Sequence, residues 1–238
     1  MATMNAPTKV AQTNAATKSP QIRVSRRSPA YWRVTIDNPP INVMGPEMVQ
    51  QFQEVINALE TDEQVRVVVF ESAVDDYFLN HSDFTAKLED LTAMPAGPTG
   101  LPPWPDFLVR LTHLPVASIA LIRGRATGNG SEITLACDMS FASREKTIIS
   151  QWEVGVGMVA GGGPMARLPE LIGRNRALEV LLSTAQTRAQ IPPGTPIQWF
   201  RGEMSTLCLI SESENVGSVI LTMDYEFGRL CIPYWSAG

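Results

Sequence analysis

The stretch VASIALIRGRATGNGSEITLACDMSFA, residues 116–142, contains a strand pattern, a glycine turn and a helix pattern in immediate succession. Its first part, VASIALI (116–122), is a continuous apolar run, which is typical of a strand covered on both faces. A turn predicted at 123–130, which ends in Gly128-Asn129-Gly130, leads into a predicted helix at 131–137, and another strand is predicted at 138–142. This order predicts a unit of two parallel strands joined by a right-handed crossover.

Upstream of this unit, the chain alternates strand and helix patterns in the same way. Residues 21–27 and 30–37 alternate apolar and polar side chains, and they predict an antiparallel hairpin. Residues 46–60 predict a helix, because Pro46 suits a first helical turn and the apolar residues fall on one face. Residues 65–71 (VRVVVFE) predict a second buried strand. The sequence therefore predicts an α/β fold.

The remaining elements are less regular. We expect a loop at 72–82, a proline-rich flexible excursion at 90–105, a helix at 106–113, a strand at 147–151, a glycine-rich loop at 155–163 and helices at 164–171 and 174–183. Beyond residue 184 the apolar runs are strand-like or aperiodic, and no strong amphipathic helix pattern is found.

The composition is that of a globular chain. Of its 238 residues 44% are apolar and 18% are charged, and no apolar run of membrane-spanning length occurs. The three cysteines, Cys137, Cys208 and Cys231, are scattered, and the only histidines are His81 and His113. These spacings argue against a disulfide scaffold, a zinc site or a histidine-based metal centre, so we predict no bound metal.

The charge distribution is asymmetric. The first 36 residues contain six basic and no acidic residues, so the remainder carries 13 basic and 24 acidic residues, a net charge of −11. Such an acidic body argues against nucleic-acid binding. We interpret 1–20 as a disordered leader; the alternative is an organelle-targeting peptide, because such peptides are poor in acidic residues. We expect a cytoplasmic location, or a mitochondrial one if the leader is a transit peptide.

The turn at Gly128-Asn129-Gly130 is the first candidate for chemistry. Its glycines allow close approach of a ligand to the backbone, and N–H groups at a helix start point toward a developing oxyanion. The alternative is an ordinary strand-to-helix turn in which Ser131 or Glu132 caps the helix.

A pair of glutamates is the second candidate. Glu153 follows a predicted strand and precedes the glycine-rich loop, and the alternative for it is a surface carboxylate beside a mobile turn. It lies 21 residues from Glu132, so a meeting between the two depends on tertiary folding. If they meet, one can act as a base while the other, with a raised pKa, acts as an acid.

Taken in order, five segments make residues 30–183 resemble the enoyl-CoA hydratase/isomerase (crotonase) superfamily. They are VTIDNPPINVMGPEM, VRVVVFESA, YFLNHSDF, ASIALIRGRATGNGSEITLACDMSFAS and QWEVGVGMVAGGGPMARLPELIGRNRALEVLLS. The resemblance implies a crotonase-like spiral of ββα turns, with two roughly perpendicular sheets and surrounding helices. It also implies a coenzyme A thioester as substrate, no cofactor, and a homotrimer or hexamer.

The resemblance also assigns roles to individual residues. The backbone N–H groups of Ser82 and Asn129 would form an oxyanion hole for the thioester enolate. Glu132 and Glu153 would activate a water for attack at C3 and deliver a proton at C2. The same motifs place the remaining substrate-binding residues at His81, Asp83, Gly128, Gly130 and Trp152.

Three departures from the family pattern lie within these motifs, and one of them is Asn129, which replaces a common glycine but still offers its N–H. Asn80 and His81 replace a small residue and a glycine in the first oxyanion segment. His81 is either a loop or packing residue or an acid–base group, since imidazole titrates near neutrality. Trp152 stands where a proline or small residue is common, and we expect it to narrow the acyl pocket.

A larger departure follows Ser183. Family members continue into helices that cover the acyl-CoA site and build the trimer, whereas residues 184–238 match none of this. We interpret the chain as a leader (1–20), a crotonase-like core (21–183) and a frameshifted or divergent C-terminal segment (184–238) in which the helical region is absent or altered. Hydration of a 2-enoyl-CoA is the first functional hypothesis. The alternatives are another crotonase-type isomerase or hydrolase, and a non-catalytic acyl-CoA-binding relative.

Overall fold

The computed structural model describes residues 19–183 and the strand segments 197–200, 207–210, 218–225 and 228–235. Its main sheet has six strands, of which the first two are antiparallel and all other neighbours are parallel. In spatial order these strands are β1 (Ile22–Ser28), β2 (Tyr31–Ile36), β3 (Val67–Ser72), β5 (Ala117–Ile122), β7 (Met139–Ser143) and β9 (Ile197–Phe200).

A second, smaller parallel sheet joins β4 (Tyr77–Leu79), β6 (Arg125–Thr127) and β8 (Ile148–Ser150). Each of these short strands directly follows a strand of the main sheet and precedes a helix. The helices that close the three turns are α3 (Pro103–Leu111), α4 (Asn129–Ala136) and α5 (Pro164–Ile172). The repeat of long strand, short strand and helix confirms the predicted α/β fold built from ββα turns.

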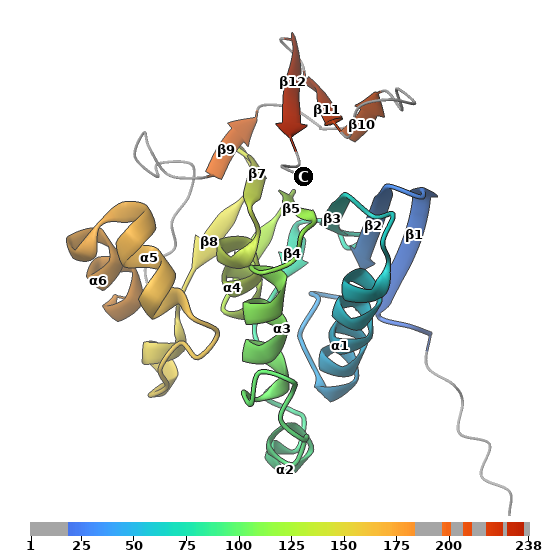
Figure 1. The fold of residues 1–238 in the computed structure, drawn as a ribbon. Helices are drawn as coiled ribbons and strands as arrows, with labels where there is room; N and C mark the ends of the chain where they lie inside the picture. Colours follow the sequence, from blue (N-terminus) through green and yellow to red (C-terminus); the bar gives the residue numbers. More distant parts are fainter. Residues whose placement is uncertain (1–18, 184–196, 201–206, 211–217, 226–227, 236–238) are drawn as a thin grey trace, which may run out of the picture.

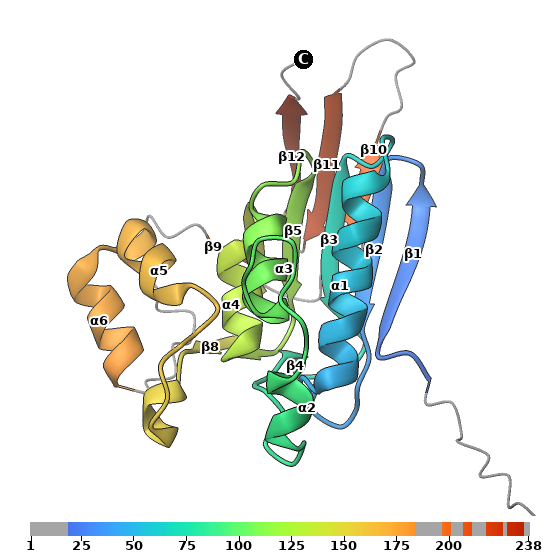
Figure 2. The same cartoon turned by 60° about the horizontal axis from the view of Figure 1, so that its bottom comes forward.

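Helices cover the main sheet. Figures 1 and 2 show α1 (Pro46–Thr61), α3 and α4 side by side against it, with α5 and α6 (Arg174–Leu182) at one end. A short α2 (Leu88–Thr92) precedes α3, and a 3-10 turn, η1 (Glu153–Val156), follows β8. This arrangement leaves the starts of α3, α4 and α5 near one another.

The core lies between the main sheet and the helices α1, α3 and α4. Every residue of β5 is buried, as is most of β3, which explains their continuous apolar sequences. The buried face of α1 consists of Met48, Val49, Phe52, Val55, Ile56 and Leu59. Each such side chain contributes about 1.5–3 kcal/mol when fully buried, so this helix is fixed firmly on the sheet.

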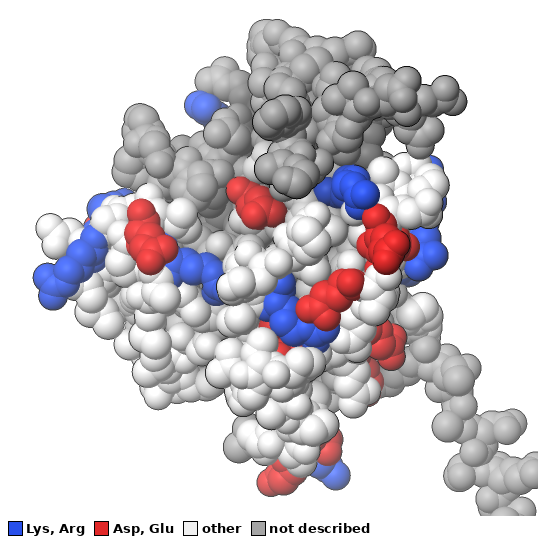
Figure 3. Space-filling model, viewed as in Figure 1, with Lys and Arg blue, Asp and Glu red and all other residues white. Residues whose placement is uncertain are grey.

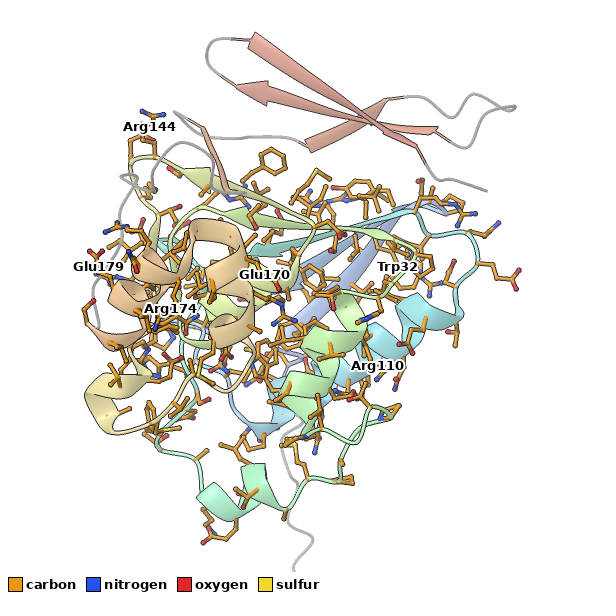
Figure 4. The ribbon with its side chains drawn as sticks, turned by 60° about the vertical axis from the view of Figure 1, so that its left-hand side comes forward. Trp32, Arg110, Arg144, Glu170, Arg174 and Glu179 are labelled. Carbon is orange, nitrogen blue, oxygen red and sulfur yellow. The ribbon has the colours of Figure 1, made fainter. Side chains whose placement is uncertain are left out.

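A polar network joins α3 to α1. Arg110 on α3 donates to both carboxylate oxygens of Glu60, at 2.8 and 2.5 Å, and to Asn57 Oδ1 at 2.6 Å. It also pairs with buried Asp106, which in turn accepts from the backbone N–H and hydroxyl of Thr99. Figure 4 labels Arg110 between the two helices. The network fixes the position of α3 and of the loop before it.

Three sequence predictions differ from the structure. The expected loop at 72–82 contains β4 and the expected turn at 123–130 contains β6; each strand has only three residues, too few to produce a recognisable periodicity. The expected excursion at 90–105 ends early, because α3 begins at Pro103, where the missing N–H of proline costs no helical hydrogen bond.

The described parts of the chain beyond residue 184 are strands. β9 extends the main sheet beside β7, and β10 (Leu207–Ile210), β11 (Ser218–Tyr225) and β12 (Gly228–Trp235) pair antiparallel as a separate sheet. No helix lies in these segments, as expected from the absence of an amphipathic pattern. Most of the expected leader, residues 1–18, and much of 184–238 lie outside the described residues.

No helix in the described part of the chain is both long and apolar enough to cross a bilayer. On the face shown in Figure 3, acidic and basic side chains are interspersed.

Candidate active site

A cavity of about 220 Å³ lies where the starts of α3 and α4 meet the loop after β4 and the η1 region. Two glutamates, several aromatic rings and a number of glycines line it. The lining residues are His81, Ser82, Phe84, Trp104, Pro105, Gly128, Asn129, Glu132, Trp152, Glu153, Val156, Met158, Val159, Gly161 and Gly162. Segments from four parts of the sequence therefore form one site.

Glycines determine the shape of the turn at the start of α4. Gly128 has φ +55°, a backbone conformation that favours glycine, and a Cβ there would lie 3.3 Å from Trp152 Nε1 and 3.4 Å from Glu153 Oε1. A Cβ on Gly130 would overlap the backbone carbonyl of Leu79 in β4. The first glycine therefore brings the backbone close to the cavity, and the second lets α4 pack closely on the small sheet.

The loop after β4 presents a backbone N–H to the same region. Met44 forms a parallel bridge with Ser82, in which Met44 N–H donates to His81 O and Asp83 N–H donates to Met44 O, both at 2.9 Å. In such a bridge the N–H of Ser82 itself points to the opposite side. Among the described residues, neither Ser82 N–H nor Asn129 N–H has a hydrogen-bond acceptor.

Side chains also link these two positions. The Ser82 hydroxyl donates to Asn129 Oδ1 at 2.9 Å, and Asn129 Nδ2 donates to Glu132 Oε2 at 3.2 Å. The oxyanion-hole candidates and one glutamate therefore belong to one hydrogen-bonded group.

Glu132 is buried and held by several donors. Trp104 Nε1 donates to its Oε2 at 2.6 Å, and the backbone N–H of Gly162 donates to its Oε1 at 2.5 Å. Burial raises the pKa of Glu132, while these donors, Asn129 and the charge of Arg167 act in the opposite direction. A carboxylate with raised pKa and a fixed orientation is suited to proton transfer.

Glu153 is half-buried and opens into the cavity from η1. The side-chain amide of Gln151 is oriented so that it bonds to both Glu153 and Ser131. The amide nitrogen donates to the two Glu153 carboxyl oxygens at 3.0 and 3.1 Å, and the amide oxygen accepts from Ser131 Oγ at 2.9 Å. Burial raises the pKa of Glu153, and the negative charge of Glu132 raises it further. The two carboxylates are thus close enough to interact electrostatically.

Three aromatic side chains form a group at the cavity, here called the aromatic rim. Ring centroids are 4.8 Å apart for His81 and Trp152, 5.4 Å for His81 and Phe84, and 5.6 Å for Phe84 and Trp152. His81 Nδ1 lies 2.7 Å from Ser82 O. Because a carbonyl only accepts, Nδ1 carries the proton, and in the neutral ring Nε2 is then the acceptor.

A second, largely apolar cavity of about 390 Å³ adjoins the first. It lies among η1, α5 and α6 and shares Glu153, Met158 and Val159 with the first cavity. Figure 4 labels Glu170 on α5 and Arg174 on α6 beside this region. Glu153 therefore lines both cavities.

Most of the residues singled out in the sequence come together. His81, Ser82, Gly128, Asn129, Glu132, Trp152 and Glu153 all line the first cavity. The other two expected substrate-binding residues do not line it: Asp83 accepts hydrogen bonds from Thr85 N and Oγ1, which shape its loop, and Gly130 packs on Leu79.

The structure contradicts two alternatives to an active site that the sequence left open. The suggestion that Ser131 or Glu132 caps the helix is wrong, because α4 has no side-chain cap and Gly128 is the N-cap residue. The suggestion that Glu153 is a plain surface carboxylate is wrong as well, since it is half-buried against the cavity.

Several residues of the site were missed in the sequence. Trp104 lies in the stretch predicted as a flexible excursion, Gln151 ends the predicted strand 147–151, and Gly162 lies in the predicted glycine-rich loop. The glycine run 161–163 was the available signal, because a glycine is needed where a backbone meets a buried side chain closely.

The ββα spiral and a cavity with two facing glutamates define a crotonase-type protein. Residues 27–191 match the family model described as "Enoyl-CoA hydratase/isomerase", more than half of the chain. The chain belongs to the enoyl-CoA hydratase/isomerase family.

Solved structures are similar over the same region. A Streptomyces avermitilis protein, itself only a candidate enoyl-CoA hydratase, is 34% identical with a TM-score of 0.65, over 71% of this chain and 63% of that one. An enoyl-CoA hydratase of Geobacillus kaustophilus HTA426 is 26% identical with a TM-score of 0.64, over 73% of this chain and 65% of that one. An enoyl-CoA hydratase of Bacillus anthracis, which is 24% identical, shares the fold with a TM-score of 0.63, over 71% of this chain and 65% of that one. The chain spans just under two thirds of these proteins' lengths.

Proposed function

We propose that this chain hydrates a 2-enoyl-CoA thioester. The observation that carries the proposal is that Glu132 and Glu153, from different elements, open into one cavity that also contains Ser82 and Asn129. Water then adds across the C2=C3 bond: its oxygen bonds to C3, one of its protons passes to a carboxylate, and C2 receives a proton from the other carboxyl group. The thioester oxygen carries the negative charge of the enolate between these steps.

The surroundings of the glutamates favour one assignment of roles. Burial raises the pKa of Glu132, but its hydrogen bonds from Trp104, Gly162 and Asn129 oppose this rise and favour the ionised form, so we assign it as the base that activates water. The charge of Glu132 raises the pKa of Glu153, which favours its protonated form. We therefore assign Glu153 as the acid that protonates C2.

The backbone N–H groups of Ser82 and Asn129 are proposed to hold the thioester oxygen. Two donors fixed in place before the reaction stabilise an enolate without reorganisation, and one such donor typically contributes a factor of about 10²–10³ to turnover. The aromatic rim supports a substrate whose conjugated acyl group is flat.

The test is the loss of ultraviolet absorbance when the chain is mixed with crotonyl-CoA. We expect turnover, and we expect Glu132→Gln and Glu153→Gln to lower kcat by about 10²–10⁴-fold. Glu54→Gln, at an exposed position on α1, is the matched control and should keep full activity. Equal activity of all three variants would refute the assigned roles.

Parallel assays separate the alternatives. Conversion of a 3-enoyl-CoA without hydration of crotonyl-CoA would replace the proposal with double-bond isomerisation, which needs the same enolate. Binding of acetyl-CoA in calorimetry, with no turnover of any tested thioester, would indicate a non-catalytic acyl-CoA-binding protein.

A further inference from the structure

We propose that Trp104 is a positioning residue for the reaction, which holds the Glu132 carboxylate in place through its indole N–H. The inference rests on the proposed function of Glu132. It starts from the 2.6 Å hydrogen bond that Trp104 Nε1 donates to Glu132 Oε2.

The indole is itself held firmly. Trp104 is buried and stacks on Phe107, with centroids 5.4 Å apart and planes at 19°, and it contacts Phe52 of α1 at 5.4 Å. The Arg110 network fixes α3, which carries Trp104, to α1. The donor therefore has one orientation, set by the core.

Counting acceptor sites shows what this bond does. A carboxylate has about four lone-pair sites. Trp104 and Asn129 both bond to Oε2, and Gly162 bonds to Oε1. The remaining site is therefore on Oε1, and Trp104 determines which of the two oxygens faces a water molecule.

Other charged groups also face Glu132. Arg167 of α5 acts on it as a cation, Glu153 of η1 interacts with it as an anion, and His81 of the loop after β4 lines the same cavity. Removing the indole N–H leaves these groups unchanged and takes away one donor from the ionised form. The pKa of Glu132 should then rise.

The experiment compares Trp104→Phe with Trp32→Phe in the full chain. Trp32 is a buried indole on β2, labelled in Figure 4, and its Nε1 has no hydrogen-bond partner among the described residues, so its replacement by Phe makes the ring smaller but removes no hydrogen bond. For Trp104→Phe we expect kcat with crotonyl-CoA to fall about tenfold or more, and the acid limb of the kcat/KM profile to move to higher pH. Trp32→Phe should leave that limb in place.

A second measurement does not depend on turnover. The chain has five tryptophans, and in ¹⁵N-labelled protein one indole N–H resonance should shift with pH as Glu132 ionises. This resonance should be missing in Trp104→Phe and should lose its pH dependence in Glu132→Gln, which carries the test if Trp104→Phe fails to fold. An indole spectrum that titrates identically in Glu132→Gln, or an unshifted acid limb in Trp104→Phe, would overturn the inference. Absence of turnover in the unmodified chain would refute the proposed function alone.

Discussion

Gly162 approaches Glu132 so closely that its N–H donates to Oε1 at 2.5 Å and any Cβ on Gly162 would overlap the carboxyl group. The contact joins the glycine-rich loop to α4 across 30 residues of sequence. It also explains why a residue without a side chain is needed at this position.

Gly162→Ala should therefore displace the Glu132 carboxyl group. Because misplacement of a reacting group by about 1 Å costs about 10²-fold in rate, we expect kcat with crotonyl-CoA to fall by about that factor. The control is Gly161→Ala, since a Cβ there has only one neighbour, the carbonyl of Val159 at 4.0 Å. Equal kcat values for the two variants would show that the contact does not position Glu132.

Removing the charge of Glu132 should lower the pKa of Glu153. The negative carboxylate is one of the causes that raise this pKa, so in Glu132→Gln it should fall back toward 4.5. Titration of the glutamate side-chain carboxyl carbons by ¹³C NMR measures the change. A Glu153 signal that titrates at the same pH in both proteins would contradict the coupling.

The raised pKa values also predict how stability varies with pH. Above pH 4.5 the folded chain retains protons on Glu132 and Glu153 that the unfolded chain has released. The free energy of unfolding should therefore fall as the pH rises from 4.5 through the raised values, and then level off. Urea titrations at several pH values should show a shallower fall in Glu132→Gln than in Glu54→Gln, and parallel curves would be evidence against the raised pKa values.

Gln151 should control the orientation of Glu153. Its amide donates to both carboxylate oxygens, so Gln151→Met removes two donors at nearly constant volume. We expect about a tenfold loss of kcat, because a hydrogen bond typically contributes about 0.5–1.5 kcal/mol and about 1.4 kcal/mol corresponds to a factor of ten in rate. Ser131→Ala removes only the hydroxyl that donates to the Gln151 amide oxygen, so it should lower kcat less than Gln151→Met does. A larger loss in Ser131→Ala would argue against this arrangement.

Trp152 should limit the size of the acyl group. Its ring packs edge-on against His81 and Phe84 at the cavity, so Trp152→Ala should open space for a bulkier acyl chain. The ratio of kcat/KM for a cinnamoyl-CoA over crotonyl-CoA should rise about tenfold, the scale on which pockets discriminate by size. Trp152→Phe should give a smaller rise, and an unchanged ratio in both variants would place the limit elsewhere.

The sequence predicted the long elements well, because they have a clear period or a continuous apolar run. α1 and β5 were found within one or two residues. β4 and β6 were missed, since three residues carry no period and their pairing depends on contacts with distant strands. The predicted start of α4 was two residues late, because two of its first residues belong to the glycine turn.

The residues of the site can likewise be divided into those with a signal in the sequence and those without one. Glu132 stands out because it follows a recognisable strand and turn, and Glu153 because it follows a predicted strand and precedes the glycine-rich loop. Trp104 does not, because its bond to Glu132 spans 28 residues and arises only when α3 packs beside α4. A motif gives the identity of a reacting group, whereas its hydrogen-bond partners come from the packing of other turns of the spiral.

The bonds from Ser82 to Asn129 and from Asn129 to Glu132 all run in one direction. Since Ser82 Oγ donates a hydrogen bond to Asn129 Oδ1, the amide nitrogen of Asn129 faces the carboxylate of Glu132, and the dipoles along this row add together. A change in the charge of Glu132 therefore alters the electrostatic potential at Ser82, beside the proposed position of the thioester oxygen. The row electrically couples the proposed base, Glu132, to the proposed oxyanion hole.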